Sequence, residues 1–455
     1  MKPLKLTLLI AAVLAPVSPI FADDLGDLKA EISKMRADYE QRIQQLEQRI
    51  AEIEVKQNYV RAEIATVKSA PTSSKNNNSF NPAISMVLNG QFSDYSEPAD
   101  GYELSAFSLQ GEGGLAREGF SLGESEITLS ASVDQLLFAQ STIALHDHEG
   151  STEVEIEEAF IETLGLGNGL TVRAGRFYSP IGYLNEKHIH AWNFADAPLI
   201  YRGLFGNQLG TDGVKLSYLL PTDLYAEIGG TVGNGDRHPG SGEHSGIGDW
   251  LVYAKTGGDI GTNHSWQAGV SHWQASPEKR AYSGGHDHGG ADGGAVEFSG
   301  DTDISNISLI YKWAPNGNYR QRSFTLLGEY FYSKEDGTLD LHDEIHGDES
   351  AFYDGKQYGG FIEGIYQFNP QWRTGLRYDR LGSKLRASDD ELLTDAGLDF
   401  SGYHPQRYSL MMEWLPSEFS RVRAQINHDK SSQNDDTQLF LQYTVSIGAH
   451  AAHSF

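Results

Sequence analysis

The stretch that decides the fold is LFLQYTVSIGAHAAHSF, residues 439–455. Apolar residues recur here at every second position, and in a β-strand that spacing places them on one face. The residues on that face are Leu439, Leu441, Tyr443, Val445, Ile447, Ala449 and Ala451, and the same parity ends at Phe455. The stretch therefore predicts a strand that holds one face against an apolar medium.

Similar short segments recur from Asn81 onward between turn signals. Sixteen strands are predicted, near residues 84–92, 121–132, 136–146, 153–163, 169–177, 212–219, 223–231, 250–257, 264–274, 303–313, 322–333, 356–367, 371–380, 405–414, 420–428 and 437–455. An even number of alternating strands is typical of single-chain bacterial outer-membrane barrels. The terminal aromatic residue resembles the signal by which such barrels are recognised for insertion. The predicted fold class is an all-β transmembrane barrel of about 16 antiparallel strands.

The connections between these strands alternate in length. The tight connections are Gly165 to Asn168, Leu220 to Thr222, Asn369-Pro370 and Leu415 to Ser417, and the long ones are 93–120, 178–211, 232–249, 275–302, 334–355 and 381–404. Short periplasmic turns and long extracellular loops are expected of an outer-membrane barrel, whereas a soluble sandwich has no reason to lengthen every second connection. The pattern predicts an outer-membrane location with the N-terminal region in the periplasm and the long loops outside the cell.

The first residues and the composition agree with export. Lys2 and Lys5 precede an apolar run from Leu6 to Val17, and Ala22 stands before two aspartates, which predicts a secretory signal peptide over residues 1–22. Cysteine is absent, so neither disulfides nor thiolate metal sites are available. The formal charge of −27 argues against a nucleic-acid partner and favours cations.

Heptad spacing predicts a periplasmic coiled coil over residues 23–68, followed by a polar linker over 69–80 and the barrel over 81–455. The apolar positions are Leu25, Leu28, Ile32, Met35, Tyr39, Ile43, Leu46, Ile50, Ile53, Val60, Ile64 and Val67. This narrow seam suits contacts between chains, and its composition favours a homotrimer over a dimer. The alternative is an amphipathic helix lying on the protein's own surface.

Sixteen strands enclose an aqueous lumen unless something fills it. The connection 178–211 is the richest in bulky residues, and Tyr183, Trp192, Phe194, Tyr201 and Phe205 are expected to pack it inside the barrel. The residues expected to face the ion path and set selectivity at a pore constriction are Glu186, Lys187, His188, His190, Asp196 and Arg202. The alternative is a loop folded over the rim.

Three stretches carry a resemblance to a known family: NPAISMVLNGQF (81–92), GRFYSPIGYLNEKHIHAWNFADAP (175–198) and GAHAAH (448–453). With the coiled coil, they make the chain resemble the phosphate-selective porin O/P-like outer-membrane family. It looks closest to a His-rich, zinc-regulated proteobacterial group that is sometimes labelled TonB-dependent receptor. The resemblance implies a trimeric barrel in the outer membrane. Phosphate selectivity is not implied, because clusters of arginine and lysine are not evident in the sequence. Residues 23–80 are too few to form a TonB-type plug.

Many histidines fall in or beside the predicted extracellular loops, several of them next to acidic residues. The candidate metal ligands are His146, Asp147, His148, His286, Asp287, His288, His342, Asp343 and His346. Zinc accepts imidazole nitrogen and carboxylate oxygen, so these loops are candidates for weak, exchangeable Zn²⁺ binding. The alternative is that each His/Asp pair is simply solvated, as polar loops commonly are. No cofactor is expected to be required.

These observations favour a porin that lets small ions or solutes diffuse passively, preferring cations and aiding zinc uptake through its loops. The alternative is an adhesin or envelope-tethering protein that uses the barrel as its anchor. The expected partners are two further copies of the chain, outer-membrane lipids and lipopolysaccharide, and the barrel assembly machinery during insertion. Enzyme activity is not expected, because no GxSxG motif occurs.

Overall fold

The structure is a computed structural model that describes residues 82–111, 113–148, 151–241, 246–282, 296–341, 348–398 and 402–448. The expected signal peptide, coiled coil and linker lie outside the described residues. No helix within the described residues is both long and apolar enough to cross a membrane.

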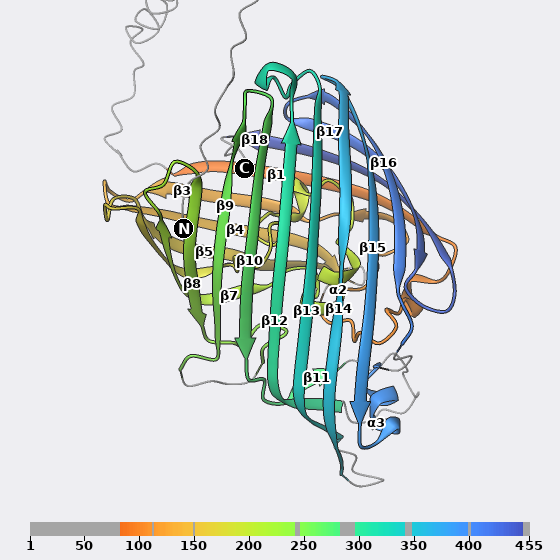
Figure 1. Ribbon diagram of the computed structural model, residues 1–455. Coiled ribbons are helices and arrows are strands. Elements are labelled where there is room, and N and C mark those ends of the chain that lie inside the picture. Colours follow the sequence, from red (N-terminus) through yellow and green to blue (C-terminus); the bar gives the residue numbers. More distant parts are fainter. Residues whose placement is uncertain are drawn as a thin grey trace, which may run out of the picture. The chain divides into compact units, whose positions relative to one another are not determined.

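The described residues form one antiparallel sheet that closes on itself (Figure 1). Its strands are β1 Ala83–Tyr95, β2 Gly119–Leu122, β3 Ser125–Ser132, β4 Leu137–His148, β5 Ser151–Thr163, β6 Leu170–Tyr178, β7 Gly210–Leu219, β8 Tyr225–Gly233, β9 Asp249–Ile260, β10 His264–Ala275, β11 Arg280–Tyr282, β12 Val296–Trp313, β13 Ser323–Leu341, β14 Glu349–Asn369, β15 Trp372–Ala387, β16 Gln406–Ser417, β17 Ser420–Lys430 and β18 Asp436–Gly448. The helices are short: α2 Leu199–Phe205, α3 Asp390–Asp395 and the 3-10 turns Ala99–Gly101, Ile189–Ala191 and Pro315–Gly317.

The 18 strands occupy 16 positions around the barrel, here called staves. The numbers differ because β2 shares a stave with β3, and β11 shares one with β10. β2 and β3 pair with different halves of β1, so together they form one stave that is interrupted at residues 123–124. β11 pairs with β12 beyond the end of β10 and prolongs the β10 stave. β1 also pairs with β18, from Ser85 opposite Gly448 to Tyr95 opposite Gln438, and this pairing closes the ring. The predicted barrel of about 16 strands is confirmed.

The two faces of the wall differ in polarity, as β18 shows. Leu441 is 48% exposed on the outside, whereas its neighbour Gln442 is 3% exposed and faces inward. Exposed apolar side chains recur around the barrel, among them Ile84, Leu88, Ile161, Leu216, Ile228, Val252, Val270, Ile307, Leu309, Tyr330, Ile362, Leu376, Leu410, Ile426, Leu439 and Tyr443. An apolar exterior around a polar interior is the reverse of a soluble barrel and matches a lipid-facing surface.

Two details differ from the sequence-based expectation. β12 to β15 extend well past their predicted ends, because pairing continues where outward positions carry polar residues such as Asp301 and Lys334 and the apolar alternation stops. The turn predicted at residues 415–417 lies later: Leu415 to Ser417 continue β16 through an irregularity in register, and β17 begins at Ser420. The long connections gather at the end of the barrel that carries β11 and α3, at the bottom of Figure 1.

Candidate functional site in the barrel lumen

Residues 179–209, which connect β6 to β7 and are here called the inner segment, cross the lumen. The backbone N–H groups of Tyr183 and Leu184 donate to Glu329 of β13 at 3.0 and 2.9 Å. Leu199 N–H donates to Asp379 of β15 at 2.9 Å. β15 lies halfway around the ring from β6. The segment therefore runs through the barrel and not over its rim.

Apolar packing holds the inner segment in place. α2 is buried along its whole length, and the Tyr201 ring lies 5.2 Å from that of Phe331 on β13. Four of the five aromatic residues expected to point inward are buried, namely Trp192, Phe194, Tyr201 and Phe205. The fifth, Tyr183, is partly buried and packs against the hydrophobic cluster that contains Trp192, Tyr201 and Phe205. The connection between β1 and β2 packs closely against α2, because a Cβ added to Gly203 would come 2.7 Å from the Phe107 ring. Bulky side chains that would be costly to expose to water thus explain why this connection enters the lumen.

Asp196 is the main polar anchor of the inner segment. Its carboxylate lies 2.7 Å from Arg377 Nη2 and 2.8 Å from Arg407 Nη1, and it accepts hydrogen bonds from Gln425 and Asn427. Arg202 approaches the same carboxylate at 3.8 Å. Burial opposes ionisation, but Arg407 and Arg377 outweigh it and hold the pKa of Asp196 well below its usual range. Two of the six expected constriction residues, Asp196 and Arg202, are thus brought together.

The lumen wall carries clusters of basic residues that were not evident in the sequence. Arg423 of β17 donates to the Trp192 carbonyl at 2.7 Å and pairs with Glu413 at 2.9 Å. Arg421 donates to the His190 carbonyl, and Arg373 of β15 pairs with Glu413 at 2.6 Å. Arg373 and Arg423 belong to different strands, β15 and β17, whereas Arg421 and Arg423 occupy alternate positions of β17. Only the parity of those positions could have indicated the grouping beforehand.

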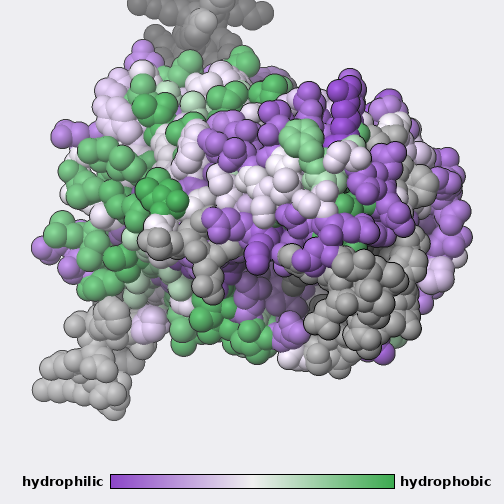
Figure 2. Space-filling model, turned by 90° about the horizontal axis from the view of Figure 1, so that it is seen from below, coloured by the Kyte–Doolittle hydropathy of each residue, from purple (hydrophilic) through white to green (hydrophobic). Residues whose placement is uncertain are grey.

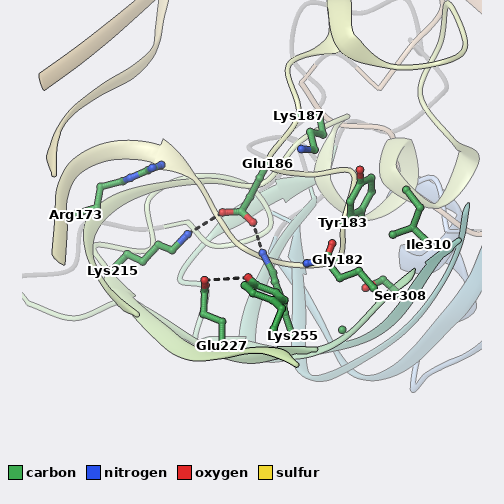
Figure 3. A pocket seen from close by; sticks show the side chains of 13 residues that line it. Arg173, Gly182, Tyr183, Glu186, Lys187, Lys215, Glu227, Lys255, Ser308 and Ile310 are labelled. Atoms are coloured by element: carbon green, nitrogen blue, oxygen red, sulfur yellow. Dashed lines mark hydrogen bonds and ion pairs between the residues drawn. The ribbon is translucent and has the colours of Figure 1, made fainter. Parts of the chain in front are cut away.

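Glu186 and Lys187 line a cavity of about 300 Å³ on the side of the short connections. Glu186 lies between two wall lysines, at 2.8 Å from Lys215 Nζ and in contact with Lys255 (Figure 3). Burial alone would raise the pKa of Glu186, but the two lysines hold it well below its usual range. Arg173 also lines the cavity, so cationic groups outnumber carboxylates around Glu186.

His188 and His190 form a second cluster, with glutamates from β3 and β5. His188 Nδ1 lies 3.2 Å from Glu126 and 3.4 Å from Glu157, and its Nε2 lies 3.1 Å from Glu158. His190 Nδ1 lies 2.6 Å from Glu126. Burial would lower the pKa of His188, but Glu126, with Glu157 and Glu158, raises it well above its usual value.

The expected loop histidines separate into two groups. His146, near the end of β4, lies with Glu124 and Glu157 in a group of possible ligand atoms all within 4.8 Å of one another. The backbone of Asp147 and His148 belongs to β4, but their side chains lie outside the described residues. His286, Asp287, His288, His342, Asp343 and His346 also lie outside them. His146 therefore lies close to Glu157, which also contacts His188 of the inner segment. The sequence did not predict this proximity.

No family model matches the chain. An uncharacterized protein of Aquifex aeolicus is 29% identical over 366 residues, which cover 74% of this chain and 71% of that protein. Similar solved structures include a loop-deletion mutant of OmpT, an outer membrane protein of Vibrio cholerae (11% identity, 81% and 99% of the two chains, TM-score 0.48). Others are an anion-selective porin from Comamonas acidovorans (13%, 81% and 99%, TM-score 0.48) and the outer membrane channel DcaP of Acinetobacter baumannii (11%, 81% and 97%, TM-score 0.45). At such low identity, the likeness assigns no role to any residue of this chain. The resemblance to phosphate-selective porins remains a prediction.

Proposed function

We propose that the protein is an outer-membrane porin through which small ions or solutes diffuse passively. The observation that carries the proposal is a closed barrel whose exterior is apolar and whose interior is charged and narrowed by the inner segment. A lipid-exposed barrel satisfies all backbone hydrogen bonds between strands, and a polar lumen of 16 staves has room for water. The side chains of Glu186, His188 and Asp196 would then set the electrostatic barrier in the pore.

Conductance across planar bilayers tests this proposal. The purified, refolded protein should produce discrete current steps in a salt solution. Deleting residues 182–206 of the inner segment should enlarge each step, provided that circular dichroism shows the barrel still folded. Absence of current from the folded wild-type protein would favour the alternative of an adhesin or envelope tether.

We further propose that the pore favours cations. The support is the formal charge of −27, since an excess of acidic residues attracts cations to the protein. Figure 2 views the end with the long connections, where hydrophilic residues cover the middle and hydrophobic ones the left margin. The lysines and arginines of the lumen oppose this preference. Reversal potentials in salt gradients decide the balance, and an anion-selective potential would contradict the proposal.

The His/Asp-rich loops are proposed to collect zinc weakly at the mouth. The support is the composition of residues 285–290 and 341–347 together with zinc's acceptance of imidazole and carboxylate ligands. A variant lacking residues 284–294 and carrying glutamine at His342 and His346 should lose weak zinc binding by calorimetry. If this variant bound the same number of zinc ions with the same affinities as the wild-type protein, the loops would be excluded as the zinc-collecting site.

The assembly is proposed to be a homotrimer joined by the coiled coil over residues 23–68, inserted by the barrel assembly machinery among lipids and lipopolysaccharide. The support is the heptad pattern of the N-terminal region and the apolar exterior of the wall. Native mass spectrometry of the full chain and of a chain that begins at residue 80 tests it. A monomer in the full chain would overturn the trimer.

A further inference from the structure

The lumen contains a group of side chains whose arrangement fits a divalent transition metal. We infer that His188, Glu126 and Glu157 form a binding site for Zn²⁺ or a chemically similar ion inside the barrel. This site is distinct from the loop histidines, and it does not depend on whether the barrel conducts ions.

The distances suit direct coordination. His188 Nδ1 lies 3.2 Å from Glu126 Oε2 and 3.4 Å from Glu157 Oε2, and the three possible ligand atoms lie within 4.8 Å of one another. A tetrahedral zinc ion with bonds of about 2.1 Å separates its ligand atoms by about 3.4 Å. The three groups therefore need only small shifts to receive the ion.

The second ring nitrogen of His188 is already oriented as metal-binding histidines usually are. Nε2 lies 3.1 Å from Glu158 Oε2, and that carboxylate accepts a hydrogen bond from Gln140 at 3.1 Å. Metal-ligating histidines commonly donate their free N–H to a carboxylate, which fixes the ring and makes the ligating nitrogen more basic. With Nε2–H donating to Glu158, Nδ1 keeps its lone pair free, and carboxylate oxygens of both Glu126 and Glu157 lie within 3.4 Å of it.

A β-bulge places both neighbouring glutamates on the lumen side. In the pairing of β4 with β5, Thr142 lies opposite Glu158 and Ile143 opposite Ile156, so Glu157 is the extra residue. In a regular strand, consecutive side chains point to opposite faces, and bulges are over-represented where a side chain must be re-aimed. Glu157 is only 5% exposed, and its Oε2 completes no hydrogen bond with the described residues.

The local charge also favours a cation. Glu126, Glu157 and Glu158 are buried, and their ion-pair contacts within the described part of the chain are with His188 and His190 alone. Three carboxylates thus face two imidazoles, and a negative charge remains even when both imidazoles are protonated. Buried carboxylates without a compensating cation are costly, and metal coordination is one of the ways in which proteins compensate them.

A cavity adjoins the group. Glu124 and His146 line a cavity of about 470 Å³ on the side of the long connections, and both fall within 4.8 Å of Glu157 as possible ligand atoms. Because Glu157 belongs to both groups, it links the proposed site to a second position nearer the mouth. Imidazole nitrogen in the ligand set favours zinc over calcium or magnesium, which prefer oxygen ligands alone.

The experiment uses the full chain, purified in detergent, freed of metal with a chelator and titrated with Zn²⁺ by calorimetry. All variants are made in the background without residues 284–294 and with glutamine at His342 and His346, so that loop binding does not interfere. His188→Gln and Glu157→Gln should each weaken binding at least about tenfold, and Glu158→Gln should weaken it by a smaller factor. Co²⁺ in place of Zn²⁺ should show visible absorption bands of a tetrahedral site that His188→Gln abolishes.

His272→Gln is the matched control, because His272 also lies beside a carboxylate, with Nε2 at 3.6 Å from Asp303, but makes no second ion pair with a carboxylate among the described residues. It should leave zinc binding unchanged, and excess Ca²⁺ should not displace the zinc. Circular dichroism verifies the fold of each variant, and the two isosteric Glu→Gln changes serve if His188→Gln does not fold. Full zinc affinity in His188→Gln and in Glu157→Gln would overturn the inference, whatever the conductance of the barrel.

Discussion

Arg407 Nη1 of β16 lies 2.8 Å from Asp196 Oδ2 of the inner segment, and both side chains are almost fully buried. Replacing Asp196 with asparagine should leave Arg407 and Arg377 without their carboxylate, and breaking a buried pair in this way costs about 3–5 kcal/mol. We expect the free energy of unfolding in lipid vesicles to fall by about 3 kcal/mol. The freed segment should also make single-channel currents larger and noisier in planar bilayers. Asp435→Asn, which removes an exposed pair with Lys430, is the control and should change neither quantity.

Glu186 of the inner segment lies between two lysines of the barrel wall, so its replacement should change ion selectivity. Glu186→Gln leaves Lys215 and Lys255 uncompensated and should shift the reversal potential in a KCl gradient towards anion preference. Lys255→Gln should shift it in the opposite direction. Asp301→Asn alters a residue on the outer face of β12 and should have no effect. An unchanged reversal potential in Glu186→Gln would show that Glu186 lies off the ion path.

His238 should make the connection between β8 and β9 sensitive to acid. Its Nε2 atom is buried, and burial together with the charge of Arg280 lowers the pKa of His238 from its usual 6.5 to about 3. Between these pH values the unfolded chain binds a proton that the folded chain does not. Stability is therefore complete above pH 6.5 and falls as the pH decreases towards 3. His238→Gln should flatten this dependence when urea midpoints are measured across the range, whereas parallel curves would contradict it.

The outward face of β18 should tolerate no charge at its centre. Leu441→Arg places a guanidinium in the apolar band and should destabilise the inserted barrel by about 2–4 kcal/mol. Thr437→Arg, near the end of the same strand, should cost about 0–1 kcal/mol. Urea titrations of folding into lipid vesicles measure the difference. Equal costs at the two positions would mean that this face is covered by protein and not by lipid.

The alternation of the predicted strands and the lengths of the connections were enough to predict the barrel, its 16 staves and the polarity of each face. These properties depend on local rules, since a strand repeats every two residues and turns have recognisable residues. Strand ends were less predictable where outward residues are polar, as in residues 296–302, the first part of β12. The aromatic residues of the inner segment also predicted correctly that it enters the lumen.

The sequence by itself determined that this chain forms a barrel with an apolar outside, and it indicated His188, Glu186 and Asp196 as candidate residues of a pore constriction. Only the tertiary structure decided their partners. Arg407 lies 211 residues from Asp196, and Glu157 faces His188 because one bulge changes the phase of β5. Barrel closure and register bring such residues together, and neither leaves a periodic mark on the sequence. Local periodicity therefore determined the strands of the barrel wall, whereas long-range strand register determined which side chains meet in the lumen.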